Sequence, residues 1–146
     1  MHSLLYRKPC PGTKKKLRET RADDYISEQI LGVLMGMQHQ LKLYHWQTTS
    51  YARHKAIDTF MKAYVPLLDR FVETYQGALG RRIFLQRHVL KLDDLSHEDV
   101  VAYVRQMEAF LRDVVGPAVQ PYPDVVNLRD EILGHTHQLL YLFTLE

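Results

Sequence analysis

The sequence predicts an all-α fold, a bundle of four helices with a long crossover between the second and the third. Apolar residues recur every three or four positions through most of the chain, and alternating strand patterns are nearly absent. Residues that favour turns and helix ends divide this pattern into four long segments. With 146 residues, 46% of them hydrophobic and 25% charged, the chain is long enough for one domain with a sizeable core.

The first two helices are predicted from about Asp23 to Gln47 and from about Tyr51 to Leu79. In the first, the expected buried stripe is Ile26, Ile30, Val33, Met37, Leu41 and Tyr44. In the second it is Ile57, Phe60, Tyr64, Leu68, Phe71 and Tyr75. Gly32 and Gly36 leave room for a close neighbour on the first helix, and Thr48-Thr49-Ser50 separates the two and can cap the second. The second should end near Gly77 or Gly80.

The other two helices follow a connection over residues 81–95, which could include a short helix. Ser96 and Asp99 form a capping-box variant that opens the third helix, and Gly116-Pro117 is expected to stop it. Pro121-Tyr-Pro123-Asp124 is expected to start the fourth, which should run to about Phe143. Four antiparallel helices with one long crossover are typical of a ferritin-like bundle.

The charge is unevenly distributed along the chain. The net charge of +2 combines residues 1–22, with seven basic and one acidic residue (7 − 1 = +6), and residues 23–146, with 12 basic and 16 acidic (12 − 16 = −4). Residues 1–22 are therefore predicted to be a flexible basic arm, and residues 23–146 the helical domain. The arm is a candidate for sequence-independent DNA binding through phosphate contacts. Its basic residues are Arg7, Lys8, Lys14, Lys15, Lys16, Arg18 and Arg21.

Other features of the sequence indicate a cytoplasmic protein. No apolar run reaches the roughly 18 residues of a membrane span, and the N-terminus lacks the apolar core of a signal peptide. Cys10 is the single cysteine, so no internal disulfide can form. We therefore expect no membrane partner.

A second, polar stripe runs along the predicted second helix. His54 and Asp58 are four residues apart, and so are Asp69 and Glu73. At about 100° per residue the four side chains fall within about 100° of one another, away from the apolar stripe. Histidine with carboxylates is a ligand set suited to iron, manganese or zinc, and oxygen-rich sets with open positions favour iron.

One chain cannot bring both pairs to the same metal ion. Asp58 and Asp69 are eleven residues apart, about 16 Å along a helix. The pairs can meet if this helix packs antiparallel against its copy in a second subunit, with a two-fold axis between Ala63 and Tyr64. Each dimer would then hold two identical sites.

The residues around these pairs resemble those of a known family. Tyr44-His45-Trp46-Gln47 comes before Tyr51, His54, Asp58, Asp69 and Glu73, at spacings similar to those of the Dps mini-ferritins, DNA-binding proteins from starved cells. The resemblance covers roughly residues 41–76. It implies that His45, His54 and Asp58 of one subunit and Asp69 and Glu73 of its two-fold mate form a ferroxidase centre for one or two iron ions. Peroxide or oxygen would be the oxidant, and the product would be ferric iron stored in a cage of twelve subunits. Basic N-terminal extensions bind DNA in many members.

A non-catalytic protein with the same bundle, used for structure or nucleic-acid packaging, is the alternative. Three departures from the family favour it: Lys62 on the ligand face, Pro66 within the helix, and a loop between His45 and His54 about three residues shorter. Thr74 also stands where the family usually has arginine. Glu131 and His135 form a further pair four residues apart, but no Glu-x-x-His motif accompanies them. We interpret His39, His88, His97, His135 and His137 as packing or surface residues.

Overall fold

A computed structural model describes residues 14–85 and 88–145 of the chain, with side chains from residue 22 onward. The described part is all-α and contains no strand. Its elements are α1 (Lys14–Gln47), α2 (Tyr51–Leu79), α3 (His97–Phe110), a π-helical turn η1 (Leu111–Val115), α4 (Gly116–Val119) and α5 (Pro123–Leu142). Within this part of the chain, no helix is both long and apolar enough to cross a bilayer.

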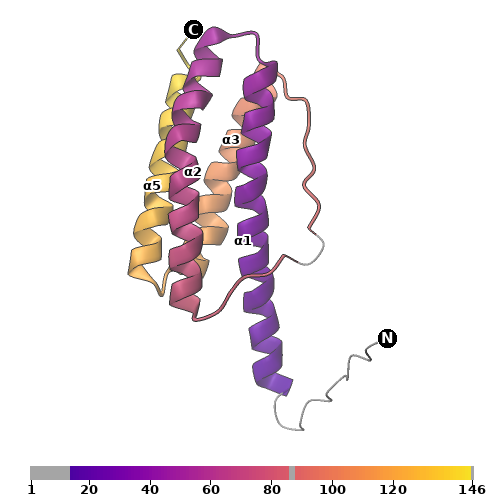
Figure 1. The fold of residues 1–146 in the computed structure, drawn as a ribbon, viewed down its shortest axis with the longest axis vertical. Coiled ribbons are helices and arrows are strands. Elements are labelled where there is room, and N and C mark those ends of the chain that lie inside the picture. Colours follow the sequence, from indigo (N-terminus) through magenta and orange to yellow (C-terminus); the bar gives the residue numbers. More distant parts are fainter. Residues whose placement is uncertain (1–13, 86–87, 146) are drawn as a thin grey trace, which may run out of the picture.

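The helices run side by side along one long axis (Figure 1). In that view α1 rises and α2 descends beside it. The crossover then returns along the outside of α1, so that α3 descends in the same direction as α2, and α5 rises to the C-terminus. The N-terminal turns of α1 project beyond the other helices.

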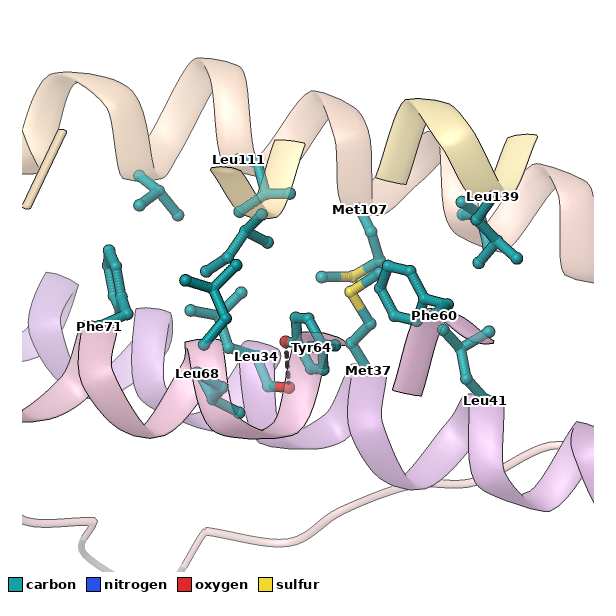
Figure 2. Close-up of a cluster of buried hydrophobic side chains, with 14 of the residues drawn as sticks. Leu34, Met37, Leu41, Phe60, Tyr64, Leu68, Phe71, Met107, Leu111 and Leu139 are labelled. Carbon is teal, nitrogen blue, oxygen red and sulfur yellow. Dashed lines mark hydrogen bonds between the residues drawn. The ribbon is translucent and has the colours of Figure 1, made fainter. Parts of the chain in front are cut away.

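The core lies between α1, α2, the segment α3–η1–α4, and α5 (Figure 2). All six residues of the stripe predicted for α2 are buried. On α1, Ile30, Met37, Leu41 and Tyr44 are buried as predicted, whereas Val33 is half-buried and Ile26 is exposed. Ile26 instead lines a cavity of about 800 Å³, together with Tyr75 and Leu79 of α2 and Pro117 of α4.

Capping residues fix both ends of α2 and the start of α3 where the sequence predicts them. The Ser50 hydroxyl accepts a hydrogen bond from the Arg53 amide at 3.3 Å and starts α2. Gly80 ends α2 in the left-handed conformation, with φ of 67°. Ser96 and Asp99 form the complete capping box that opens α3. These caps set the length of α2, the helix that carries four of the five candidate ligands.

Two predicted boundaries differ from the structure. Helix α1 begins at Lys14 rather than near Asp23, so the second half of the predicted arm is helical. Lys14, Lys15, Lys16, Arg18 and Arg21 lie on this part of α1, whereas Arg7 and Lys8 lie outside the described residues.

Gly116-Pro117 does not stop the third helix, because the helical segment widens into a π-turn before it. The Gly116 amide bonds to the Leu111 carbonyl, five residues back. Pro117 then falls in the first two positions of α4, where an α-helix has no use for the missing N–H. The fourth long helix begins at Pro123, as expected, and ends at Leu142.

The crossover is an extended loop without a helix in its described residues, 81–85 and 88–95. The buried Gln40 side chain holds its far end by donating to the Asp93 carbonyl at 2.8 Å and accepting from the Asp93 amide at 2.9 Å. A Cβ added at Gly32 would lie 2.3 Å from the His88 ring, and one at Gly36 would lie 3.6 Å from Leu90. The glycines of α1 therefore make room for this loop, and not for another helix.

Candidate metal centre

The centre of the candidate site is a pair of histidines where α1 ends and α2 begins. The three-residue loop 48–50 brings the last turn of α1 next to the first turn of α2, so the rings of His45 and His54 stack with centroids 3.8 Å apart and 21° between their planes. Each ring is also hydrogen-bonded to the backbone of the other residue. His45 Nδ1 lies 3.1 Å from the His54 carbonyl oxygen, and His54 Nδ1 lies 2.9 Å from the His45 carbonyl oxygen.

These two hydrogen bonds determine which ring nitrogens can bind a metal ion. A carbonyl oxygen can only accept, so Nδ1 carries the proton in both rings. In the neutral ring, Nε2 then keeps its lone pair free for a metal ion. Metal-binding histidines are commonly oriented in this way, by donation of the other N–H to a backbone carbonyl. The pair is therefore preorganised to present two imidazole Nε2 atoms.

Burial keeps the first of these rings neutral. His45 is buried, and its pKa is lowered below 6.5, first by loss of solvent and then by the neighbouring His54. Asp58 acts on His45 in the opposite direction, so its carboxylate lies close enough to be felt at the imidazole. A neutral imidazole is the form that binds metal ions, and it persists here at a lower pH than in a free histidine.

Asp58 is half-buried one turn beyond His54, and a lysine already occupies it. Lys62 Nζ lies 3.0 Å from Asp58 Oδ2. This hydrogen bond is the main cause that lowers the pKa of Asp58, so the carboxylate is ionised at neutral pH. The Asp58 carboxylate thus has the negative charge that a metal site requires, but in this chain it is paired with the Lys62 ammonium.

Asp69 and Glu73 lie farther along α2 and do not join the others within one chain. Both are exposed, and the helix places Asp69 about 16 Å beyond Asp58. In the described part of the chain, no group of three or more His, Cys, Asp or Glu side chains is close enough to hold a metal ion. The structure therefore joins His45 to His54 and brings Asp58 near them. A meeting with Asp69 and Glu73 requires a second chain and stays a prediction.

A groove of about 460 Å³ beside Asp58 was not predicted from the sequence. It runs between α1 and α2, and its lining residues are Gln38, His39, Lys42, Trp46, Asp58, Met61, Lys62 and Val65. Trp46 is 70% exposed, with the Lys42 ammonium 5.6 Å from its ring centroid. Trp46, directly after His45, was the one signal in the sequence that could have pointed to it.

His97 and His137 lie in other surroundings, whereas His39 lines the groove beside Asp58. His97 packs edge-on against Tyr44 at 6.2 Å between ring centroids, and His137 lies 3.3 Å from a Glu108 oxygen on the surface. A larger cavity of about 800 Å³ lies at the opposite end of α2, and Tyr75 is among its lining residues. Tyr75 is 21 residues, or about 30 Å, beyond His54, so this cavity is separate from the candidate site.

Comparison with known sequences identifies the family. Residues 45–143 match a family of unknown function, DUF5856. The chain belongs to this family. The match begins at His45 and includes all five candidate ligands, whereas the basic N-terminal residues lie outside it.

A phage protein is similar over most of its length. It is an uncharacterized 14.6 kDa protein in the mobD-ri intergenic region of Enterobacteria phage T4, 30% identical over 129 residues, which are 88% of this chain and 92% of the phage protein. No solved structure matches the chain.

Proposed function

We propose that this chain is a cytoplasmic ferritin-like protein of the Dps type, which oxidises Fe(II) at sites shared by two subunits and stores the ferric product. The stacked pair His45 and His54 is the observation that supports this most. Two rings with both Nδ1 atoms hydrogen-bonded to carbonyls are suited to binding a metal ion through Nε2. The up-down-down-up order of the helices around the crossover is the arrangement expected of a ferritin-like bundle.

The proposed site draws three ligands from one subunit and two from its mate. His45, His54 and Asp58 form the first half, and Asp69 and Glu73 of the partner subunit form the second. Imidazole and carboxylate together suit iron, and the carboxylates stabilise the higher charge of Fe(III). Two Fe(II) ions would give two electrons to hydrogen peroxide, which takes up two protons and leaves as two water molecules. Oxygen is the alternative oxidant.

The surface around the proposed two-fold axis is suited to contact another helix. Val65 is 41% exposed and Pro66 is exposed beside it, while Met61 and Val65 line the groove between α1 and α2. In an antiparallel contact centred between Ala63 and Tyr64, residue 61 of one chain lies opposite residue 66 of the other. The apolar groove of each subunit would then cover the exposed apolar turn of its mate. Twelve subunits would close a cage by resemblance to the family.

The decisive experiment is anaerobic titration with Fe(II) followed by peroxide, with ferric absorbance as the signal. We expect a peroxide-dependent signal from the wild type and a large loss in the variant His45→Ala/His54→Ala. A matched control is His137→Ala, because that histidine is exposed and lies outside the proposed site. A wild type indistinguishable from the double variant would refute the proposal.

We also propose that the basic N-terminal region binds DNA without sequence preference. Lys14, Lys15, Lys16 and Arg18 fall within five consecutive residues at the start of α1. Lysine contacts to phosphate carry no base information and weaken steeply as salt rises. A multi-subunit particle would display many copies, which strengthens weak contacts.

The alternative function is a non-catalytic ferritin-like protein that builds a particle or packages nucleic acid. The ion pair between Lys62 and Asp58 favours it, because an ammonium already neutralises a candidate ligand. The pair is weak, since the Lys62 side chain is 75% exposed, and exposed ion pairs contribute little to stability. A purified protein that keeps its assembly but binds neither iron nor zinc would support this alternative.

A further inference from the structure

Lys62 lies where a cation would not be expected on a face that binds metal ions. It follows Asp58 by one helical turn, and its ammonium is 3.0 Å from Asp58 Oδ2. It also lines the groove beside the candidate site, together with Met61 and Val65. Its long stem is largely exposed, so the ammonium can leave the carboxylate without disturbing the core.

We propose that Lys62 is a resident counter-cation that a metal ion must displace, and that it thereby selects for metals that bind imidazole. This inference rests on the proposed function, because it requires a metal ion at Asp58. A divalent ion on the Asp58 carboxylate would stand close to the ammonium, and two like charges at that distance repel each other. Metal binding therefore requires Lys62 to swing away from the site.

The selectivity follows from what each metal ion gains at the site. Mg²⁺ and Ca²⁺ prefer oxygen ligands, so carboxylates supply most of their affinity. When Lys62 neutralises Asp58, these ions lose much of that attraction. Fe²⁺ and Zn²⁺ also gain from imidazole, and both histidines keep Nε2 for a metal ion because their Nδ1 atoms are bound to backbone carbonyls. Lys62 would thus keep the site free of the abundant hard cations.

The test is calorimetric titration of the full chain with Zn²⁺, in the absence and presence of Mg²⁺ on the order of the millimolar concentration found in cells. The variant Lys62→Gln should bind Zn²⁺ about two- to fivefold more tightly. Added Mg²⁺ should weaken its Zn²⁺ binding while leaving the wild type nearly unchanged. Lys62→Arg keeps a cation at this position and should restore the behaviour of the wild type.

Lys55→Gln is the matched control. Lys55 is an exposed lysine on the same helix, and it acts on Asp58 through its charge, with no hydrogen bond between them among the causes of the Asp58 pKa shift. It should change Zn²⁺ affinity much less than Lys62→Gln does. An equal effect of both variants would mean that general charge, and not occupancy of Asp58, sets the affinity, and would overturn the inference.

The remaining outcomes separate this inference from the proposed function. If the wild type and all variants bind Zn²⁺ equally, Lys62 has no such role while the metal site stands. If no variant binds Zn²⁺, the metal site itself is refuted, and the role of Lys62 with it. If Lys62→Gln binds Zn²⁺ but the wild type does not, Lys62 blocks the site and the non-catalytic alternative holds.

Discussion

Two inactive variants of this protein should restore each other when their subunits are mixed. Asp58 and Glu73 are fifteen residues apart on α2, which is about 22 Å along the helix, so they cannot bind the same ion within one chain. In the proposed dimer, the Asp58 half of each site meets the Glu73 half from the other subunit. Asp58→Ala therefore damages both sites of its own homodimer, and so does Glu73→Ala.

Random mixing of the two variants fixes the size of the recovery. About half of the dimers contain one chain of each kind, and each of these has one intact site and one that lacks both ligands. About a quarter of all sites should thus bind metal and oxidise iron, against none in either parent. Subunits are exchanged by mixing under mild denaturation and refolding, and both Zn²⁺ binding and the ferric signal are measured.

A matched mixture distinguishes this arrangement from simple stabilisation by mixing. Asp58→Ala and His54→Ala damage the same half of the site, so no heterodimer of these two chains contains an intact site. Their mixture should recover nothing. Equal recovery from both mixtures, or no recovery from Asp58→Ala with Glu73→Ala, would show that the antiparallel two-fold arrangement is wrong.

Three further predictions concern stability, pH and DNA. Tyr64→Phe should lower the free energy of unfolding in urea by about 1 kcal/mol, because the buried hydroxyl donates to the Leu34 carbonyl at 2.8 Å. Tyr44→Phe should be neutral or stabilising, because that hydroxyl is buried with no hydrogen-bond partner among the described residues; an equal loss in both would contradict this. The pKa of His45 in the folded protein is lowered below 6.5. The contribution of this neutral ring to the stability of the metal-free protein should therefore be fully present above pH 6.5 and be lost as the pH falls through the lowered value. The variant His45→Gln should lose less stability over the same pH range. Deletion of residues 1–19 should abolish DNA retardation in gels and leave iron oxidation intact, whereas a truncated protein that still shifts DNA would place the DNA site elsewhere.

Helix ends were predictable wherever one residue fixes them. Ser50, Gly80 and Ser96 act through their own hydroxyl or their own backbone freedom, and these effects are local enough to read from the sequence. The end at Gly116-Pro117 was wrong because the π-turn before it lets the helical segment continue through a residue pair that usually stops a helix. The start of α1 was wrong because the basic residues 14–22 were assigned to the arm from their charge, whereas they belong to the helix.

The pairing of His54 with Asp58 in the candidate site was also predictable, because it too depends on local helix geometry. Residues four apart on a helix share a face, so the pairing of His54 with Asp58 follows from spacing alone. The hydrogen bond between each imidazole and the backbone carbonyl of the other histidine depends on how α1 meets α2 across a three-residue loop. The spacing of residues in the sequence does not specify this geometry. Lys62 was visible as an unexpected cation, but its contact with Asp58 required the structure.

The two hydrogen bonds of the histidine pair have different structural causes. His45 lies in the last turn of α1, where carbonyl groups lack helical partners, so the bond from His54 Nδ1 satisfies one of them and needs no functional explanation. The reverse bond is different. The His54 carbonyl lies inside α2, where a regular helix already supplies it with the amide of Asp58. The carbonyl needs no second donor there, but the Nδ1–H of the buried His45 ring needs an acceptor, and this bond also holds the ring stacked on its neighbour. A cap accounts for the bond from His54, whereas the bond from His45 satisfies the N–H of a buried ring and fixes the orientation that a metal ligand would need.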